Sequence, residues 1–415
     1  MLETSPMPAV DDELLAHLRT QPRAARLFDA LAGVEGAHLV GGAVRDVLLG
    51  GEAVDLDVVV EGDAAAAART AAQRLGGRVR EHERFGTATV EADDLAFDVA
   101  RARRERYAAP GALPDVEPAS LEDDLLRRDF TVNALAVALG PPAPGTLHAA
   151  PHSREDLEAR RLRVFHDASF RDDPTRLLRL VRYATRLRFA IEPRTEELAR
   201  AAVAAGAPAT VSGGRIGDEL RLLLREPEPN ITLRLAGELG LDRALHPAFA
   251  PDPEAADRAR ALLPSGGRED LVILAAAGRG FEGDALAAWL DDLEFPAGER
   301  DAVVAAALGA APLGRRLAAA GRPSEIADAA RGYSPEAVAL AAAVVPEAVD
   351  TAARWLEDLR HVALEIDGED VLAAGVPEGP EIGRALAGAL ARKLDGEVAG
   401  REAELAAALG AIGRE

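Results

Sequence analysis

Residues 39–50, with the sequence LVGGAVRDVLLG, constrain the fold of this chain more than any other stretch. The apolar pair that opens it is typical of the end of a buried strand, and residues 44–49 predict a helix whose first turn contains Arg45. Gly41 and Gly42 predict a tight turn between the two. Glycines at such a turn let backbone N–H groups approach an anion closely, and the start of a helix favours negative charge. The stretch therefore predicts a place for a phosphate group.

Two carboxylates follow on the next predicted strand, at residues 54–60. The period of two places Asp55 and Asp57 on one face, and Leu56 and Val58 on the other. Carboxylates beside a phosphate-sized turn are hard oxygen ligands suited to Mg²⁺, which also uses substrate phosphates as ligands. An isolated Asp-x-Asp pair is more often a solvated strand end. Together with the glycine turn, however, the pair favours metal-assisted phosphoryl or nucleotidyl transfer.

The surrounding segments predict an α+β domain, with a small mixed sheet covered by helices. The predicted elements are a leading helix at 11–32, an alanine-rich helix at 63–75, and short strands at 78–83, 87–91 and 95–100. Asp98 lies on the last of these strands. It either faces the two aspartates across the sheet as a third carboxylate or points outward, and the sequence leaves both interpretations open.

A charged segment rich in proline and glycine, residues 101–118, breaks all periodicity and predicts a long loop. Loops of this length are usually functional or disordered, so the segment is either a lid near a triphosphate or a solvated surface loop. Residues 127–129 (RRD) then head an apolar run at 130–139. Their guanidinium groups lie at the edge of a pocket, or Arg128 forms an ion pair with Asp129 or a neighbour.

From about residue 155 onward, every recognisable element is helical. Residues 172–174 (DDP) start a predicted helix that runs through Phe189, with aspartate at the N-cap and proline in the first turn. Charged side chains recur along it every three or four positions and therefore share one stripe: Asp173, Arg176, Arg179, Arg182 and Arg186. A solvated basic face is the usual explanation of such a stripe, but the carboxylates at its start favour a ligand.

Composition excludes several kinds of site. The chain contains no cysteine, which excludes disulfides, zinc–thiolate sites and thiol catalysis. No basic start followed by an apolar run is present at the N-terminus, and no segment approaches the roughly 18 apolar residues of a membrane span. We therefore expect a cytoplasmic protein with no membrane partner. The net charge of −22 argues against nucleic acid, yet arginines crowd between residues 154 and 194, and local potential governs binding.

In combination, these motifs resemble those of the class II tRNA nucleotidyltransferases, the family of bacterial CCA-adding enzymes and poly(A) polymerases. The matching segments are residues 39–46 with 55–57 for the first motif, 127–134 (RRDFTVNA) for the second, 154–157 (REDL) for the third and 172–176 (DDPTR) for the base-reading motif. The glycines that usually precede the third motif are replaced by residues 151–153 (PHS), and Asp172 replaces the more usual glutamate. Residues 379–383 (GPEIG) are similar to the family's tRNA-binding tail.

The resemblance implies four regions. A nucleotidyltransferase head with the metal and triphosphate sites covers residues 1–140, and a neck with the base-reading helix covers 141–225. A helical body follows at 226–330 and a helical, tRNA-binding tail at 331–415. The implied fold class is thus a small mixed-sheet α+β head followed by an all-helical neck, body and tail.

The resemblance also implies the site. Asp55 and Asp57 are the implied catalytic residues and hold two Mg²⁺ ions about 3.5–4 Å apart. Asp98, from its place on the neighbouring strand, is the third catalytic candidate. The implied nucleotide-binding residues are Gly41, Gly42, Arg45, Arg128, Asp129, Asn133, Asp172, Asp173, Arg176, Arg179 and Arg182. Asp173 and Arg176 read the base, because a carboxylate accepts from an exocyclic amine and a guanidinium donates to a ring acceptor, an edge that C and A share. The implied partners are ATP, CTP, and the acceptor end and elbow of tRNA.

The implied reaction is template-independent addition of CCA to the 3′ end of tRNA, with release of pyrophosphate. Addition of only the terminal A stays open, as do poly(A) synthesis and transfer to a non-RNA acceptor. Addition of CC alone is disfavoured, because residues 103–107 (RRERY) are present and the family's CC-only members lack this element. A helical RNA-binding scaffold with a degenerate site is the non-enzymatic alternative. The oligomeric state is not predicted.

Overall fold

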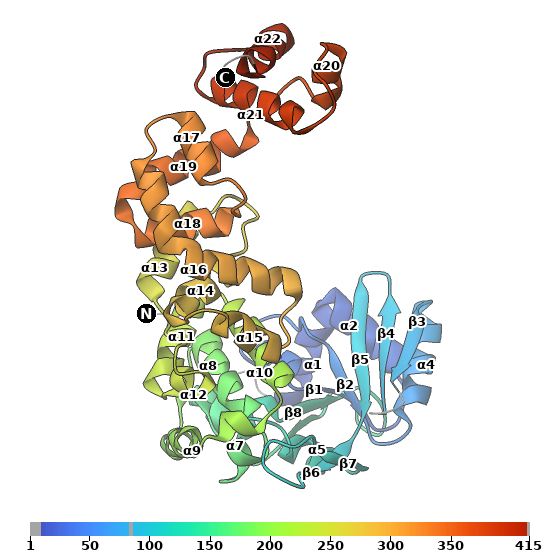
Figure 1. Ribbon diagram of the computed structural model, residues 1–415. Coiled ribbons are helices and arrows are strands. Elements are labelled where there is room, and N and C mark those ends of the chain that lie inside the picture. The colour runs from blue at the N-terminus through green and yellow to red at the C-terminus, as the bar shows by residue number, and fades with distance from the viewer. Residues whose placement is uncertain (1–9, 83–85, 413–415) are drawn as a thin grey trace. The chain divides into compact units, whose positions relative to one another are not determined.

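The computed structural model describes residues 10–82 and 86–412, and the chain divides into two compact units, Met1–Ser212 and Gly213–Glu415. The N-terminal unit is built on a seven-stranded sheet with the order β3-β4-β5-β2-β1-β8-β9 (Figure 1). Its strands are β1 (Ala37–Val40), β2 (Asp57–Val60), β3 (Arg78–His82), β4 (Thr87–Ala92), β5 (Leu95–Arg101), β8 (Leu135–Ala138) and β9 (Leu147–Ala149). The β2–β5 pair is parallel and the other pairs are antiparallel. The predicted mixed sheet is confirmed.

The strand, glycine turn and helix of residues 39–50 form as expected. All four residues of β1 are buried, Gly41 has φ 75°, and α3 (Gly42–Leu48) begins at the next residue. The following strand is shorter than predicted, because β2 begins at Asp57 and Asp55 lies in a bend before it. The alternation nevertheless holds, since both aspartates are exposed while Leu56 between them is buried.

The alanine-rich helix is α4 (Ala64–Leu75), as predicted. The Asp63 side chain accepts a hydrogen bond from the Ala66 N–H at 2.9 Å, and Gly76 ends the helix in the left-handed conformation. The three strands of the meander also form where expected. Residues 83–85, which include the predicted end of the first of them, lie outside the described part of the chain.

One predicted helix is wrong because proline divides it. The leading helix of residues 11–32 is two helices, α1 (Val10–Thr20) and α2 (Pro22–Leu31). The helix expected from residue 172 through Phe189 forms as α8 (Thr175–Leu187), and a separate short helix, α7 (Ser169–Asp172), precedes it. A residue before proline is excluded from the helical region, and Asp173 before Pro174 is extended, with φ −133° and ψ 92°.

The expected loop at 101–118 is also wrong. It contains an antiparallel hairpin of β6 (Arg103–Arg106) and β7 (Asp115–Pro118), separate from the main sheet. Arg104 lies opposite Glu117 and Arg106 opposite Asp115, so cross-strand charge pairs favour the pairing. Both strands are largely polar, which explains why no apolar alternation marked them in the sequence.

The remaining elements of this unit cover the sheet and continue the chain. Short helix α5 (Leu121–Leu126) packs Leu121 and Leu125 against Val40 and Val59 of the sheet. The others are η2 (Thr131–Asn133), α6 (Ser153–Glu158), the parallel pair β10 (Arg161–Leu162) and β11 (Ala190–Ile191), α9 (Pro193–Ala204) and η3 (Ala207–Thr210).

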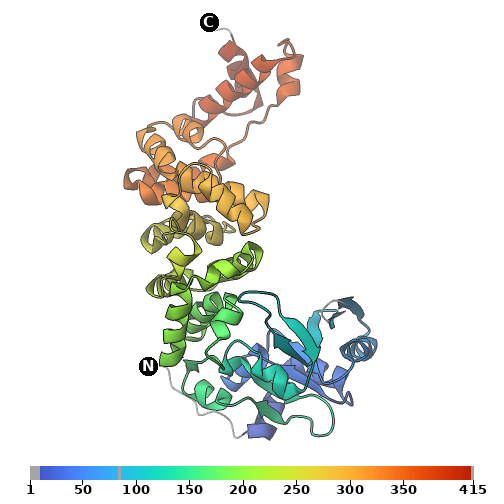
Figure 2. The ribbon, with the colours of Figure 1, turned by 60° about the horizontal axis from the view of Figure 1, so that its bottom comes forward.

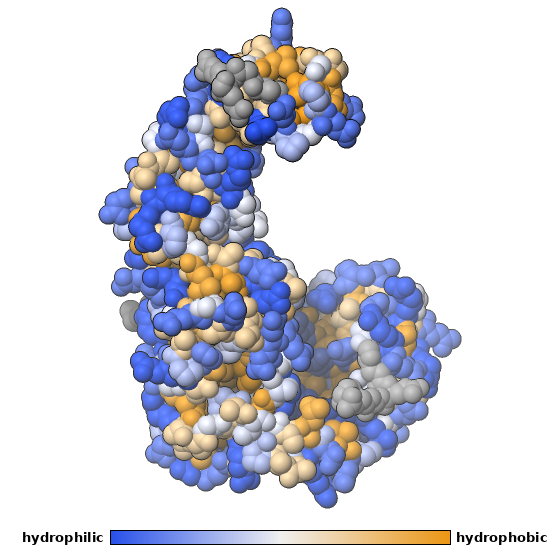
Figure 3. All heavy atoms as spheres, in the orientation of Figure 1, coloured by the Kyte–Doolittle hydropathy of each residue, from blue (hydrophilic) through white to orange (hydrophobic). Residues whose placement is uncertain are grey.

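The C-terminal unit is helical over its described residues, as Figures 1 and 2 show. Its helices are α10 (Gly213–Leu224), α11 (Pro229–Glu238), α12 (Leu241–Leu245), α13 (Pro253–Leu262), α14 (Glu269–Ala277), α15 (Ala285–Asp292), α16 (Ala297–Ala319), α17 (Pro323–Ala329), α18 (Pro335–Val344), α19 (Val349–Glu357), α20 (Gly368–Ala373), α21 (Pro380–Leu394) and α22 (Arg401–Ile412). Short 3₁₀ turns join some of them: η4 (Gly278–Gly280), η5 (Pro346–Ala348) and η6 (Leu359–His361). Hydrophilic side chains and smaller apolar patches alternate over the visible surface (Figure 3).

One helix corrects the expectation that no segment approaches a membrane span. Within the described residues, α16 alone is long and apolar enough to cross a membrane, by length and composition only. Its residues Val303, Leu313 and Leu317 are buried, and the helix packs against α14 and α18. Alanine-rich core helices pass this test as well as membrane helices do, and the sequence-based statement overlooked α16.

Candidate active site

A polar cavity of about 300 Å³ in the N-terminal unit collects residues from separate predicted motifs. Its lining comprises Gly41, Gly42, Asp57, Glu105, Tyr107, Arg127, Arg128, Asp129, Asn133, Asp173, Arg176, Arg179 and Tyr183. These residues come from the glycine turn, the start of β2, the β6–β7 hairpin, the segment after α5 and the start of α8. Segments more than 100 residues apart in sequence therefore share one site.

The glycine turn leaves room for Arg128. A Cβ atom at Gly41 would lie 2.9 Å from Arg128 Nη1, which is closer than real Cβ contacts come, and the backbone has φ 75° and ψ −134°. The Arg128 side chain is 16% exposed, and its Nη2 donates to Asp124 at 3.0 Å. Its Nε is shielded from solvent and has no hydrogen-bond partner within residues 10–82 and 86–412. A positively charged side chain thus lines the cavity beside Gly41.

Three carboxylates, Asp55, Asp57 and Asp98, lie close enough to one another for their charges to interact. Asp57 and Asp98 are paired residues of the parallel strands β2 and β5, and Asp98 also accepts a hydrogen bond from Thr89 Oγ1 at 2.7 Å. Although the Asp57 residue is exposed, the surrounding protein displaces part of the water around its carboxylate and thereby raises its pKa; the negative charges of Asp98 and Asp55 add to the rise, and Arg128 opposes it. A group of mutually repelling carboxylates is stabilised by a cation.

These carboxylates fit a Mg²⁺ site completed by substrate. Among the described residues, no three His, Asp, Glu or Cys side chains converge into a complete metal site made by the protein. Mg²⁺ commonly takes one or two carboxylates together with phosphate oxygens and water. Asp55 and Asp57 could therefore hold a metal ion together with phosphate oxygens and water, and whether Asp98 is a third ligand stays a prediction.

A buried network forms the floor of the cavity around Asp129. This carboxylate is 8% exposed and accepts hydrogen bonds from the Phe130 N–H at 2.8 Å, from Asn133 Nδ2 at 2.9 Å and from Arg179 Nε at 2.8 Å. Burial by itself would raise the pKa of Asp129, but the Arg179 guanidinium and the Asn133 amide outweigh burial and hold it below its ordinary value. Arg179 also donates to the Tyr183 hydroxyl at 3.2 Å.

Arg176 and Asp173 line the cavity at the break between α7 and α8. Arg176 is 6% exposed, and its guanidinium donates to Ser169 Oγ at 2.7 Å and to the Arg127 carbonyl at 2.8 Å. Asp173 Oδ1 accepts from the N–H and hydroxyl of Thr175, at 3.1 and 2.7 Å. Both side chains are thereby held in fixed orientations at the cavity.

Several predicted residues do not line the cavity. Arg45 is 3% exposed and donates to Asn133 Oδ1, so it lies beneath the lining. Asp172 pairs with Arg171 at 3.4 Å, and Arg182 is 5% exposed in α8. Asp55 and Asp98 do not line the cavity either. Both lie close enough to Asp57, which does line it, for their negative charges to raise the pKa of Asp57.

Sequence reasoning also missed lining residues. Tyr183 lies one helical turn after Arg179, so the spacing of the arginine stripe could have identified it. Glu105 and Tyr107 lie in the segment interpreted as a lid or a solvated loop, whereas the guanidinium group of Arg127 was expected at the edge of a pocket and does line the cavity. Burial raises the pKa of the Tyr107 hydroxyl, and the nearby Glu105, which accepts its hydrogen bond at 3.0 Å, adds to the rise.

Comparison with known proteins connects this site to one family. The model of the poly(A) polymerase head domain matches residues 37–163. The chain is 48% identical over 218 residues to an A-adding tRNA nucleotidyltransferase of Geobacter sulfurreducens, a match that covers 52% of this chain and 25% of that protein. A solved CCA-adding enzyme in its apo form is 31% identical, with a TM-score of 0.83 over 96% of this chain and 98% of the other. The chain belongs to the class II tRNA nucleotidyltransferase family.

Another class II structure extends the comparison. The Thermotoga maritima CCA-adding enzyme, solved in complex with tRNA, is 28% identical, with a TM-score of 0.78 over 98% of this chain and 99% of that one. The first three curated relatives are longer than the matched region, which covers from 23% to 45% of their length. The class II fold thus extends through both units of the chain, each of which resembles part of a solved enzyme.

Proposed function

We propose that this protein extends the 3′ end of tRNA, adding C and A from CTP and ATP without a nucleic-acid template. The observation that carries the proposal is the cavity itself, where Asp57, Arg128, Asp173 and Arg176 from four separate segments meet. Carboxylates for a metal, a cation for phosphates and a rigid donor–acceptor pair for a base are the parts that nucleotidyl transfer needs.

In the proposed reaction, the 3′ oxygen of tRNA forms a bond to the α-phosphorus, and the bond from that phosphorus to the β-phosphate oxygen breaks. Pyrophosphate leaves, and the hydroxyl proton passes to solvent or a neighbouring base. Divalent metal ions, which we propose to be Mg²⁺ held by Asp55 and Asp57, would neutralise phosphate charge and favour loss of that proton when bound.

The chain's own residues then have separate tasks in this proposal. Arg128 places positive charge beside the triphosphate, and the open space at Gly41 lets it do so. Asp173 accepts from the exocyclic amine of C or A while Arg176 donates to the adjacent ring acceptor. G and U present the opposite pattern at these positions, so the site rejects them without a template.

A second candidate is addition of the terminal A alone. It is favoured by the first three curated relatives, which are A-adding enzymes at 46% to 48% identity. The base-reading pair serves A in either case, so the site geometry suits both candidates. Poly(A) synthesis is supported only by the name of the head-domain model, and transfer to a non-RNA acceptor has no comparable observation in its favour.

One experiment separates these functions. Purified protein is incubated with tRNA lacking CCA, lacking CA or lacking only A, together with labelled CTP, ATP or both. A CCA-adding enzyme incorporates C into the first tRNA and A after it, whereas an A-adding enzyme labels only the last tRNA, and only from ATP. Absence of incorporation into all three tRNAs would overturn the proposed function.

A further inference from the structure

A buried carboxylate outside the predicted site lies behind the cavity wall. Asp124 of α5 is 0% exposed. It accepts hydrogen bonds from Arg127 Nε at 2.9 Å and Arg128 Nη2 at 3.0 Å, and from the backbone N–H of Arg103 at 3.3 Å. Arg127 Nη2 also lies 2.8 Å from it. Full burial of an aspartate is rare unless its charge is paired, and here one carboxylate forms ion pairs with two guanidinium groups.

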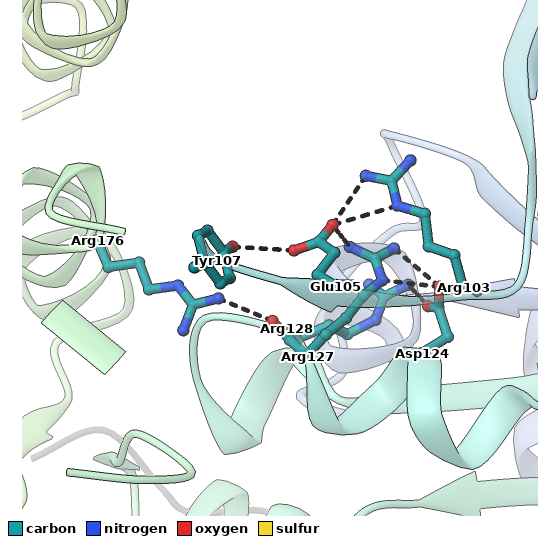
Figure 4. A network of polar contacts seen from close by, with 7 residues as sticks. All are labelled: Arg103, Glu105, Tyr107, Asp124, Arg127, Arg128 and Arg176. Atoms are coloured by element: carbon teal, nitrogen blue, oxygen red, sulfur yellow. Dashed lines mark hydrogen bonds and ion pairs between the residues drawn. The ribbon is translucent and has the colours of Figure 1, made fainter. Parts of the chain in front are cut away.

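Arg127 extends this network to the hairpin. Its Nη1 donates to Glu105 at 2.9 Å, and Glu105 also accepts from Arg103 Nη2 at 3.0 Å and from the Tyr107 hydroxyl at 3.0 Å. Figure 4 shows Asp124 and Glu105 on either side of the Arg127 guanidinium. The carboxylate of Asp124 therefore connects α5, the first strand of the hairpin and two arginines of the cavity wall.

The charges explain why the connection matters for the site. Burial lowers the pKa of Arg128, the neighbouring Arg127 lowers it further, and Asp124 counteracts both. Two guanidinium groups side by side and out of water repel each other without an anion between them. A guanidinium is a planar fork, so fixing Nη2 on Asp124 also fixes where Nη1 points, which is toward Gly41 and the cavity.

We propose that Asp124 is a positioning residue for the proposed nucleotidyl transfer: it holds Arg128 at the angle at which the guanidinium meets the triphosphate. The inference rests on the proposed function. Asp124 itself does not line the cavity, so it acts through Arg128 and not by touching the substrate.

The test compares Asp124→Asn with wild type in steady-state extension of tRNA by ATP. The substitution keeps the size of the side chain and removes its charge. We expect kcat/KM for ATP to fall about 100-fold, as for a displaced binding group, while the KM for tRNA stays unchanged. Asp124→Glu, which restores the charge on a longer side chain, should recover part of the loss. It also serves as the test variant if the neutral variant does not fold.

A double-mutant cycle with Arg128→Met separates positioning from general stability. If Asp124 acts through Arg128, the double variant loses no more kcat/KM than Arg128→Met alone. Asp270→Asn is the matched control, since this carboxylate of the other unit also accepts from two arginines, Arg225 at 3.0 Å and Arg268 at 2.8 Å. It should lower the melting temperature without changing the KM for ATP.

The outcomes are distinguishable. An active wild type with unchanged kinetics in Asp124→Asn, or losses that multiply in the double variant, would overturn this inference while leaving the proposed function intact. A wild type that extends no tRNA would overturn the proposed function instead.

Discussion

Replacement of Gly41 by alanine tests the geometry of the site, because it would have two separate effects: it would strain the backbone, and it would bring a Cβ atom too close to Arg128. The backbone at φ 75° and ψ −134° is favourable only for glycine, and a side chain there costs about 1–3 kcal/mol of unfolding free energy. The added Cβ would also lie 2.9 Å from Arg128 Nη1. Since that atom is the end of a flexible side chain, the guanidinium moves by several tenths of an ångström and little further stability is lost.

The displacement should instead appear in catalysis. A misplacement of this size in a charged binding group lowers kcat/KM for the nucleotide by about tenfold. The assay is steady-state extension of tRNA by ATP or CTP, with unfolding free energy measured in parallel by hydrogen exchange of residues 130–139.

Gly76→Ala is the matched control for backbone strain. Gly76 also has a positive φ, 68°, but a Cβ there meets nothing within 4 Å. It should destabilise the unit by about 1–2 kcal/mol and leave kcat/KM unchanged. Equal kinetic losses in both variants, or wild-type kinetics in Gly41→Ala, would refute the assignment of Arg128 to the nucleotide.

Further predictions concern stability and the metal. Asp129→Asn should destabilise the N-terminal unit by about 3 kcal/mol at neutral pH, because it removes the buried carboxylate that the Arg179 guanidinium contacts. The pKa of Asp129 in the folded protein lies below its ordinary 3.8. The difference in unfolding free energy between wild type and variant is therefore complete above pH 3.8 and vanishes as the pH falls through the folded pKa. Acid unfolding of both proteins measures this difference. His152→Gly should raise stability by about 0.5–1 kcal/mol in thermal melts, since His152 has φ 67° and the left-handed cost of about 1–2 kcal/mol exceeds the entropy cost of glycine. Asp57→Asn should abolish extension of tRNA at every Mg²⁺ concentration, and recovery at high Mg²⁺ would contradict a direct role.

Local sequence predicted the parts of the site that a short segment specifies. Gly41 and the aspartates around β2 are placed by a turn and by strand alternation, and both signals lie within about twenty residues. Pro174 was correctly assigned to the start of a helix, whereas the apolar periodicity across Pro22 was given more weight than the effect of that proline on the preceding residue.

The rest depends on contacts between distant segments. Asp124 and Glu105 become important only because Arg127 joins them, and the hairpin that carries Glu105 is stabilised by opposite charges rather than by an apolar pattern. Arg45 looked like a phosphate ligand beside the glycine turn, yet its hydrogen bond to Asn133, 88 residues later, places it beneath the cavity. No periodicity of one segment encodes these pairings.

We propose that a nucleoside triphosphate binds between Asp57 and α8, with a metal ion at Asp55 and Asp57 and the base at the α7–α8 break. A crystal structure with Mn²⁺ and a non-hydrolysable CTP analogue tests it most directly. We predict anomalous density from Mn²⁺ beside Asp55 and Asp57, and the cytosine amine within hydrogen-bonding distance of Asp173. Manganese density elsewhere, or a base outside the reach of Asp173 and Arg176, would contradict the account.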